Sequence, residues 1–472
     1  MVSKINELTH PDQISQSRQP AKPRGATRKK SKPKGTYSLA KASATLSIIA
    51  EKLRDETAKN WILKIISDGD KEEIIHCAKK LSHPKITDAI EVQGITEDKI
   101  KRMGPTKNPY SKKWLKDLRD KIKQSTATIN MTLGLFGGEG YSHATPYEIS
   151  VRAKQMELWD SSANKIILTC NEKQITMHDV QQLGKKKKLA EIYAMTKGLD
   201  SFAKSTGLSW VFLTLTCPPR MHSNPDFGEY CWDGTLPNEA NCWLAKKFGN
   251  AVERLRKKNI FLSGLRVPDP HRDGCPHWHL LVFLPSTSMK QFEITLRKQK
   301  EWKTEEGCTF IQSDGRATAP TIIFKYILKS FGSTRNTKST QASIDTWCST
   351  WKIRRYQWIG LPSIELWRNL RKVKNCPTGS PLLAAMWKAA NNSNACEFIK
   401  LAGGLNIQNK QRPVSSSTSG DNKTKRITFN FKEKSESISF YLAKWQNQNM
   451  SRKSKNVGVI LNDPSKGNSL TK

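Results

Sequence analysis

Two histidines with strand spacing are the residues of this sequence best suited to chemistry. The segment Asp269–Leu280 reads DPHRDGCPHWHL and continues into an apolar run that ends at Leu284. Such a run predicts a buried strand, and residues two positions apart on a strand point to the same face. His277 and His279 would therefore stand side by side. Two neutral imidazoles in that arrangement are two ready ligands for a divalent metal ion.

Two imidazoles do not complete a metal site, so a third ligand is needed. Asp269 and His271 both precede a turn marked by Gly274 and Pro276, which could fold either side chain back toward the pair. The competing interpretation is a pair of hydrogen-bonded core histidines, and for an isolated His-x-His that interpretation is the commoner one. Four side chains able to bind a metal within one short segment favour the metal site.

A tyrosine flanked by lysines could supply a nucleophile. If the segment Phe324–Ser330 is helical, Tyr326 and Lys329 are three positions apart and share a face. A phenol near ammonium groups and a metal ion is easier to deprotonate, because its anion is stabilised. It could then attack a phosphodiester, while Lys325 or Lys329 holds the phosphate charge. Taken alone, such a tyrosine is more often a packing residue of an amphipathic helix.

The elements that must position these residues follow from the hydrophobic pattern. Residues 40–200 favour helices, and a capping box from Thr145 to Glu148 marks one helix start. Beyond residue 208, strand patterns alternate with helix patterns. Strands are predicted at 210–216, 262–267, 277–284 and 309–312, and helices at 239–258, 288–302 and 320–330. This alternation predicts an α/β or α+β domain with one central sheet.

The charge balance points to a polyanionic partner. The chain has 79 Lys and Arg against 42 Asp and Glu, a net charge of +37. Residues 1–36 carry +7 and residues 409–472 carry +9, which leaves +21 on the part expected to fold. Nucleic acid is the leading partner and a membrane surface the weaker one. Candidate phosphate contacts are Arg266, Arg272, Arg354, Arg355 and the run Lys185–Lys188, which is as well explained as a solvated loop.

Other sequence features indicate the cellular compartment. No apolar run approaches the roughly 18–20 residues that span a bilayer, and the first residues lack a signal-peptide core. The ten cysteines form no Cys-x-x-Cys pair, which makes a zinc ribbon or a disulfide framework improbable. We therefore expect a reducing, cytoplasmic protein with no membrane partner.

Taken together, these segments resemble the HUH endonucleases, and most closely the replication gene A proteins of temperate tailed phages and prophages. The resemblance covers about residues 110–375. It is carried by FLTLTCP at 212–218, RMH at 220–222, HRDGCPHWHLLVF at 271–283, KYILK at 325–329, WCSTWKIR at 347–354 and GLPSIELWRNLR at 360–371. The histidine-rich segment is the most specific of these motifs.

This resemblance implies a fold and a reaction. The fold would be α+β, with a central antiparallel sheet flanked by helices. Charge, composition and hydrophobic pattern place a disordered basic arm at 1–36, a helical region at 37–195 and a mostly disordered basic tail at 406–472, and the resemblance makes residues 196–405 the HUH endonuclease domain. The reaction would be site-specific nicking of one origin strand in a bacterial host cell. It would leave a 5′-phosphotyrosine link and a 3′-OH that primes rolling-circle replication.

The same resemblance assigns the site residues. His277 and His279 would bind Mg²⁺ or Mn²⁺, with Asp269 preferred to His271 as the third ligand. Tyr326 would be the nucleophile, and Lys325 and Lys329 stand where the family has lysines. Many relatives carry a second tyrosine four residues earlier, where this chain has Ile322, so a cycle with two tyrosines is in doubt.

Three alternatives remain open at this stage. The same chemistry would serve a plasmid-mobilisation relaxase or a single-strand transposase. A non-catalytic basic DNA-binding protein would need the histidines only for packing. No G-x-x-x-x-G-K-[S/T] stretch occurs in the sequence, so we expect duplex unwinding to depend on a host helicase.

Overall fold

The computed structural model describes most of the chain between residues 38 and 447. The described ranges are 38–95, 109–170, 173–312, 318–331, 338–408, 411–419, 426–432, 437–441 and 446–447. The predicted basic arm at 1–36 lies outside them. Among the described residues, no helix has both the length and the apolar character needed to cross a membrane.

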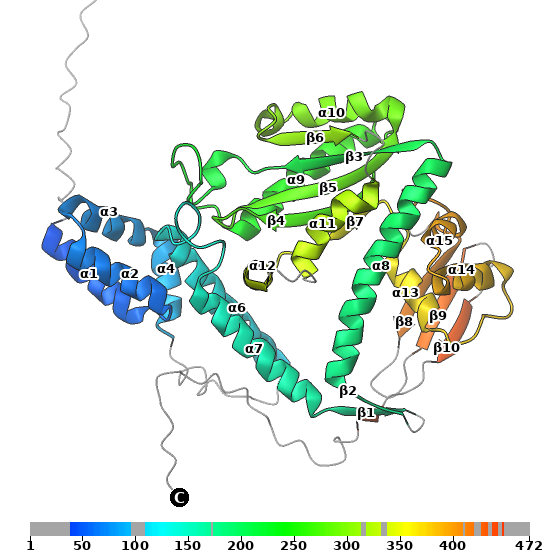
Figure 1. Ribbon diagram of the computed structural model, residues 1–472, viewed down its shortest axis with the longest axis horizontal. Helices are drawn as coiled ribbons and strands as arrows, with labels where there is room; N and C mark the ends of the chain where they lie inside the picture. Colours follow the sequence, from blue (N-terminus) through cyan, green and yellow to red (C-terminus); the bar gives the residue numbers. More distant parts are fainter. Residues whose placement is uncertain are drawn as a thin grey trace, which may run out of the picture.

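The N-terminal part is helical, as the sequence predicts. Four short helices pack around one apolar core: α1 (Leu39–Lys52), α2 (Glu56–Asp68), α3 (Lys71–Leu81) and α4 (Pro84–Gln93). Ser38, Asp55 and Asp70 cap the first three by accepting hydrogen bonds from backbone N–H groups of the first turn. Figure 1 shows this bundle at one end of the molecule.

Two long helices and a hairpin connect the bundle to the rest of the protein. Helices α6 (Pro109–Thr132) and α7 (Pro146–Asn164) lead to the hairpin β1 (Ile167–Cys170) and β2 (Lys173–Thr176). Strand β11 (Gln446–Asn447) pairs with β1. The capping box at Thr145 and Glu148 starts α7, as predicted. Helix α8 (Met177–Ser205) then returns to the central sheet and runs without interruption across the predicted domain boundary at 195/196 (Figure 1).

The central sheet is antiparallel and has the strand order β6-β3-β5-β4-β7. Its strands are β3 (Leu208–Leu215), β4 (Ser263–Pro270), β5 (Pro276–Pro285), β6 (Cys308–Gln312) and β7 (Gln357–Ile359). The four predicted strands are all present, and helices cover the sheet. The fold is therefore α+β, as predicted.

The two faces of the sheet bury two separate apolar cores. On one face, β-strand side chains such as Val211, Leu213 and Trp278 pack against α9 (Pro237–Arg256) and α10 (Met289–Arg297). On the other face, Phe212 and Leu281 pack against α8 and α11 (Ala319–Phe331). Because strand residues alternate between faces, His277 and His279 share the second face with Leu281. Helix α12 (Lys338–Trp351) contacts α11, α7 and α6.

A segment of the C-terminal region forms a small sheet. Residues 406–472 are predicted to be mostly disordered because they are rich in Ser, Asn and Gln; most of them lie outside the described ranges, so this stays a prediction. Among the described residues, β8 (Val414–Ser419), β9 (Arg426–Phe431) and β10 (Ser437–Tyr441) form a three-stranded sheet. Apolar residues at alternate positions hold it: Ile427 and Phe429 are fully buried in the core that includes α13 (Ile364–Lys372), α14 (Pro381–Asn391) and α15 (Ala395–Leu401).

Candidate active site

The β4–β5 hairpin brings together three side chains that the sequence separates. Asp269 lies directly opposite His277 in the strand register. In the connecting turn, the His271 N–H donates to the Cys275 carbonyl, and the Gly274 N–H donates to the His271 carbonyl. The turn contains Gly274 at φ +87°. Only a residue without a Cβ adopts that conformation readily, which explains the glycine. The hairpin geometry thus places Asp269 beside the histidine pair, and its role as the third ligand stays a prediction.

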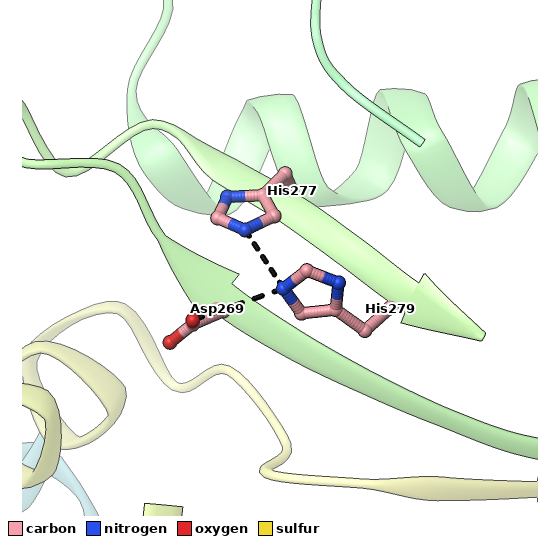
Figure 2. A group of neighbouring side chains, drawn as sticks. All are labelled: Asp269, His277 and His279. Carbon is pink, nitrogen blue, oxygen red and sulfur yellow. Dashed lines mark hydrogen bonds and ion pairs between the residues drawn. The ribbon is translucent and has the colours of Figure 1, made fainter. Parts of the chain in front are cut away.

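The three side chains converge on one point. The ligand atoms of Asp269, His277 and His279 lie within 4.8 Å of one another (Figure 2). The Nε2 atoms of the two histidines are 2.9 Å apart, and His279 Nε2 is 3.8 Å from Asp269 Oδ2. Asp269 and His279 are buried, and His277 is partly exposed.

The separation of the two histidine nitrogens suits an octahedral ion. Two ligand atoms about 2.1 Å from such an ion and at right angles to each other are about 3.0 Å apart. The two imidazole nitrogens already have that spacing. Two nitrogens and one carboxylate oxygen form a donor set that first-row divalent ions accept, and Mn²⁺ tolerates this mixture better than Mg²⁺.

Thr214 fixes the orientation of His279, a role that the sequence analysis missed. The two residues are cross-strand partners on β3 and β5, and Thr214 Oγ1 is 3.1 Å from His279 Nδ1. A hydroxyl that accepts the Nδ1–H proton leaves the Nε2 lone pair pointing at His277 and Asp269. The available signal was a polar residue within an apolar strand, on the face shared with Phe212.

His271 belongs to a neighbouring network rather than to this group. Its ring centre lies 4.3 Å from that of His277 and 5.0 Å from that of His222. Burial, and to a smaller extent the charge of the nearby His222, lower the pKa of His271 to about 4. His222 Nδ1 lies 3.0 Å from Asp273 Oδ2. Burial raises the pKa of Asp273, but the hydrogen bond and charge of His222 outweigh burial and leave it lowered.

Helix α11 places Tyr326 over the site. Ile323 and Ile327 are fully buried in the core, which turns the half-buried Tyr326 toward the strand face. The phenol ring lies 3.7 Å, centre to centre, from the ring of His279, and 5.3 Å from that of Phe212. Tyr326 and His279, 47 positions apart in sequence, are thus in contact.

Helix α11 also carries the two predicted lysines and Ile322. Lys325 is exposed on α11, beside Tyr326 in sequence. Lys329 lies on the same helix one turn later, and its side chain is outside the described part of the structure. Ile322, one turn before Tyr326, packs against the core.

The arginines that the sequence offers as phosphate contacts lie in different environments. Arg266 lies on the opposite face, with its guanidinium carbon 3.7 Å from the ring centre of Trp278. Arg272 donates to the Gly140 carbonyl at 2.9 Å and lies 3.6 Å from Asp226, so it has a structural role. Arg355 lies among other cations near α12, as described below.

Comparisons with known proteins agree with this geometry. Residues 45–327 match the family described as Bacteriophage replication gene A protein (GPA), a range that includes the histidine pair and Tyr326. The "Probable replication protein P12" of Pseudoalteromonas phage PM2 is 24% identical over 377 residues, covering 73% of this chain and 56% of that protein.

Two further relatives carry more specific names. The "Replication gene A protein" of Escherichia phage 186 is 25% identical over 281 residues, 53% of this chain and 39% of that protein. The "Probable replication endonuclease from prophage-like region 1" of Salmonella typhi is 26% identical over 255 residues, 47% of this chain and 32% of that protein. The chain thus spans between about a third and just over half of the length of these relatives. No solved structure matches it.

The family match covers more than half of the chain, and it includes the strand that carries both histidines and the part of α11 that carries Tyr326. The chain belongs to the bacteriophage replication gene A protein family.

Proposed function

We propose that this protein is a metal-dependent single-strand DNA endonuclease that initiates rolling-circle replication. The observation that carries the proposal is the contact between Tyr326 and His279, 3.7 Å between ring centres, above the group formed by Asp269, His277 and His279. A nucleophile and a metal-ligand group on one sheet face are what a phosphodiester transfer requires. The name of the Salmonella typhi relative, a probable replication endonuclease, agrees with this class of reaction.

The proposed reaction is a phosphoryl transfer from the 3′ oxygen to the Tyr326 oxygen. The Tyr326 phenol loses its proton to water, and its oxygen attacks the scissile phosphorus. The P–O3′ bond breaks, and the departing 3′ oxygen takes a proton from water to become the 3′-OH primer. The products are a 5′-phosphotyrosine link and a free 3′ end, with no change in oxidation state.

Each residue has a defined part in this reaction. Asp269, His277 and His279 would hold Mg²⁺ or Mn²⁺, which when bound polarises a phosphate oxygen. Thr214 keeps His279 in the tautomer that presents Nε2. Phe212 and His279 stack on the Tyr326 ring and fix its orientation. Lys325 and Lys329 are proposed to hold the negative charge of the phosphate.

A covalent-adduct assay tests the proposal. The protein is incubated with Mn²⁺ and supercoiled DNA carrying the replication origin of the element that encodes it, and the products are separated in SDS. We expect a protein–DNA adduct with wild type and none with Tyr326→Phe. Tyr230→Phe, at an exposed tyrosine on a loop, is the matched control and should form the adduct. An adduct that survives in Tyr326→Phe refutes the nucleophile assignment.

The same assay separates the alternatives. Sequencing the DNA end bound to the tyrosine identifies a replication origin, a transfer origin or a transposon end, and the last two would indicate a relaxase or a transposase. A non-catalytic DNA-binding protein would show no Mn²⁺ binding that depends on His277 and His279. The proposal includes a host helicase for duplex unwinding, and replication reconstituted without one would contradict that part.

A further inference from the structure

Five cations from five different parts of the chain form a continuous group beside the candidate active site. We call this group the cationic strip; its members are Lys188 on α8, Arg368 on α13, Arg355 between α12 and β7, Arg152 on α7 and Lys123 on α6. The positive charge of each member lowers the pKa of a neighbouring member. Arg368 and Arg355 lower the pKa of Lys188, and Arg152 lowers the pKa of both Arg355 and Lys123.

The strip has more positive charge than its acidic partners neutralise. Arg152 and Arg355 both pair with one carboxylate, that of Asp345, and the Arg152 Nε to Asp345 Oδ2 distance is 2.8 Å. Arg368 donates to both oxygens of Glu191, at 2.8 and 2.7 Å. These two carboxylates leave an excess of three positive charges among the seven side chains. Farther along, Asp120 near Lys123 is matched by Lys352 at 3.0 Å.

Holding these charges together has a cost. Lys123 is partly buried, and Lys188 lies on an exposed stretch of α8. Partial loss of water contact, together with the neighbouring cations, lowers the pKa of each. Like charges at short range repel one another most strongly where water is partly excluded. A polyanion placed on the strip would relieve this repulsion, and arginine guanidinium groups match phosphate with paired hydrogen bonds.

The strip adjoins the candidate active site through α12. Asp345, which pairs with both Arg152 and Arg355, lies on this helix. Helix α12 also contacts β4, the strand that carries Asp269. The helix that carries the carboxylate shared by two members of the strip therefore packs against a strand that carries a candidate metal ligand.

Aromatic rings beside the strip favour a single strand over a duplex. The Lys188 ammonium lies 5.4 Å from the ring centre of Tyr356. On the same helix, Tyr193 is 49% exposed and meets Phe324 edge to face at 5.3 Å. Phe324 is two residues before Tyr326. Exposed aromatic rings next to a cationic track are typical of surfaces that bind single strands, because unpaired bases stack on them.

We propose that the cationic strip binds the phosphate backbone of the single DNA strand that Tyr326 attacks, on one side of the scissile phosphate. The identity of that strand rests on the proposed function, but binding by the strip is measured without any cleavage. Arg355 and Lys188 are among the phosphate contacts that the sequence offers as candidates, and this proposal assigns both of them to the strip.

Salt-dependent binding tests the strip. The affinity for a fluorescein-labelled oligothymidylate is measured by anisotropy at several salt concentrations. Each phosphate contact contributes about 0.7 to the slope of log affinity against log salt for a single strand. We expect Lys188→Gln and Arg355→Gln each to weaken binding and to reduce the slope by about 0.7, and Lys188→Arg to restore both. Lys186→Gln is the control, because Lys186 is two positions earlier and so on the far side of α8.

The outcomes are distinct from those of the nicking assay. If Lys188→Gln and Arg355→Gln bind DNA as the control does, with the same slope, the strip is not a DNA surface. Tighter wild-type binding to poly-glutamate than to DNA, lost in the two variants, would overturn the proposal in favour of an acidic protein partner. If wild type forms no covalent adduct yet the variants lose DNA binding, the strip stands and the nicking proposal fails.

Discussion

Replacing Thr214 by valine should weaken metal binding while leaving the fold intact. Valine has nearly the same shape as threonine and favours a strand, so β3 is preserved. What disappears is the hydroxyl 3.1 Å from His279 Nδ1. When His279 binds an ion through Nε2, Nδ1 must carry the proton, and in the variant this N–H faces a methyl group. His279 is only 6% exposed, so water cannot easily replace the lost partner.

The expected magnitude follows from that unsatisfied donor. A buried N–H without a partner costs about 1–3 kcal/mol. Without the ion, the imidazole avoids this cost by moving its proton to Nε2, which can donate to His277 Nε2 2.9 Å away. The penalty therefore falls on the ion-bound form alone. At about 1.4 kcal/mol per tenfold, the Mn²⁺ dissociation constant should rise about 5-fold to 150-fold.

Calorimetric titration of Mn²⁺ into the purified protein measures this change, and thermal unfolding checks that the variant is folded. Thr214→Ser keeps the hydroxyl and is the matched control, so it should bind Mn²⁺ close to the wild-type affinity. If Thr214→Val binds Mn²⁺ as tightly as Thr214→Ser does, the hydroxyl does not orient His279 and the reasoning is wrong.

Three further predictions concern the ligand set and the helical region. Asp269→Asn should weaken Mn²⁺ binding at least tenfold, whereas His271→Gln should change it less than threefold; the reverse order in the same titration would make His271 the third ligand. Burial raises the pKa of Glu148 to about 7, so its contribution to stability is complete below about pH 4.5 and is lost as the pH rises through 7. Chemical unfolding of Glu148→Gln should remove that pH dependence and show a gain of about 3 kcal/mol over wild type at pH 8, and parallel pH profiles would contradict it. Gly137→Ala should destabilise the protein by at least about 1–3 kcal/mol in the same assay, because φ is +78° and the new Cβ would lie 2.1 Å from the Asn224 carbonyl oxygen; an unchanged midpoint would show that the loop yields.

Local patterns predicted the elements of this fold well. The apolar run after His279 became β5, and the Thr145–Glu148 capping box starts α7. These predictions succeeded because strand alternation and helix capping depend on residues a few positions apart. Strand β9 was not predicted for a related reason: Ile427 and Phe429 are too few to signal a strand by themselves, and they are buried only because α13 and the neighbouring helices supply a surface.

Some residues of the candidate site could likewise be placed from local spacing, and others only from the pairing of the strands. His277 and His279 were placed side by side from their spacing alone, because the side-chain period of a strand is fixed. Their partner Asp269 depended on the hairpin register, which a shift of one residue would have reversed. Thr214 could not be assigned from sequence, since its role requires β3 to pair with β5.

The sequence by itself determined which side chains are of types that can bind a metal or act as a nucleophile, that the chain is strongly cationic, and which motifs it shares with a replication family. These properties are fixed by residue type and short spacing. Only the tertiary structure decided that Tyr326 lies on His279, and that five cations from separate helices and a loop meet beside α12. Those contacts join residues tens to hundreds of positions apart, and they exist because burial of apolar faces on the central sheet fixes where each helix lies.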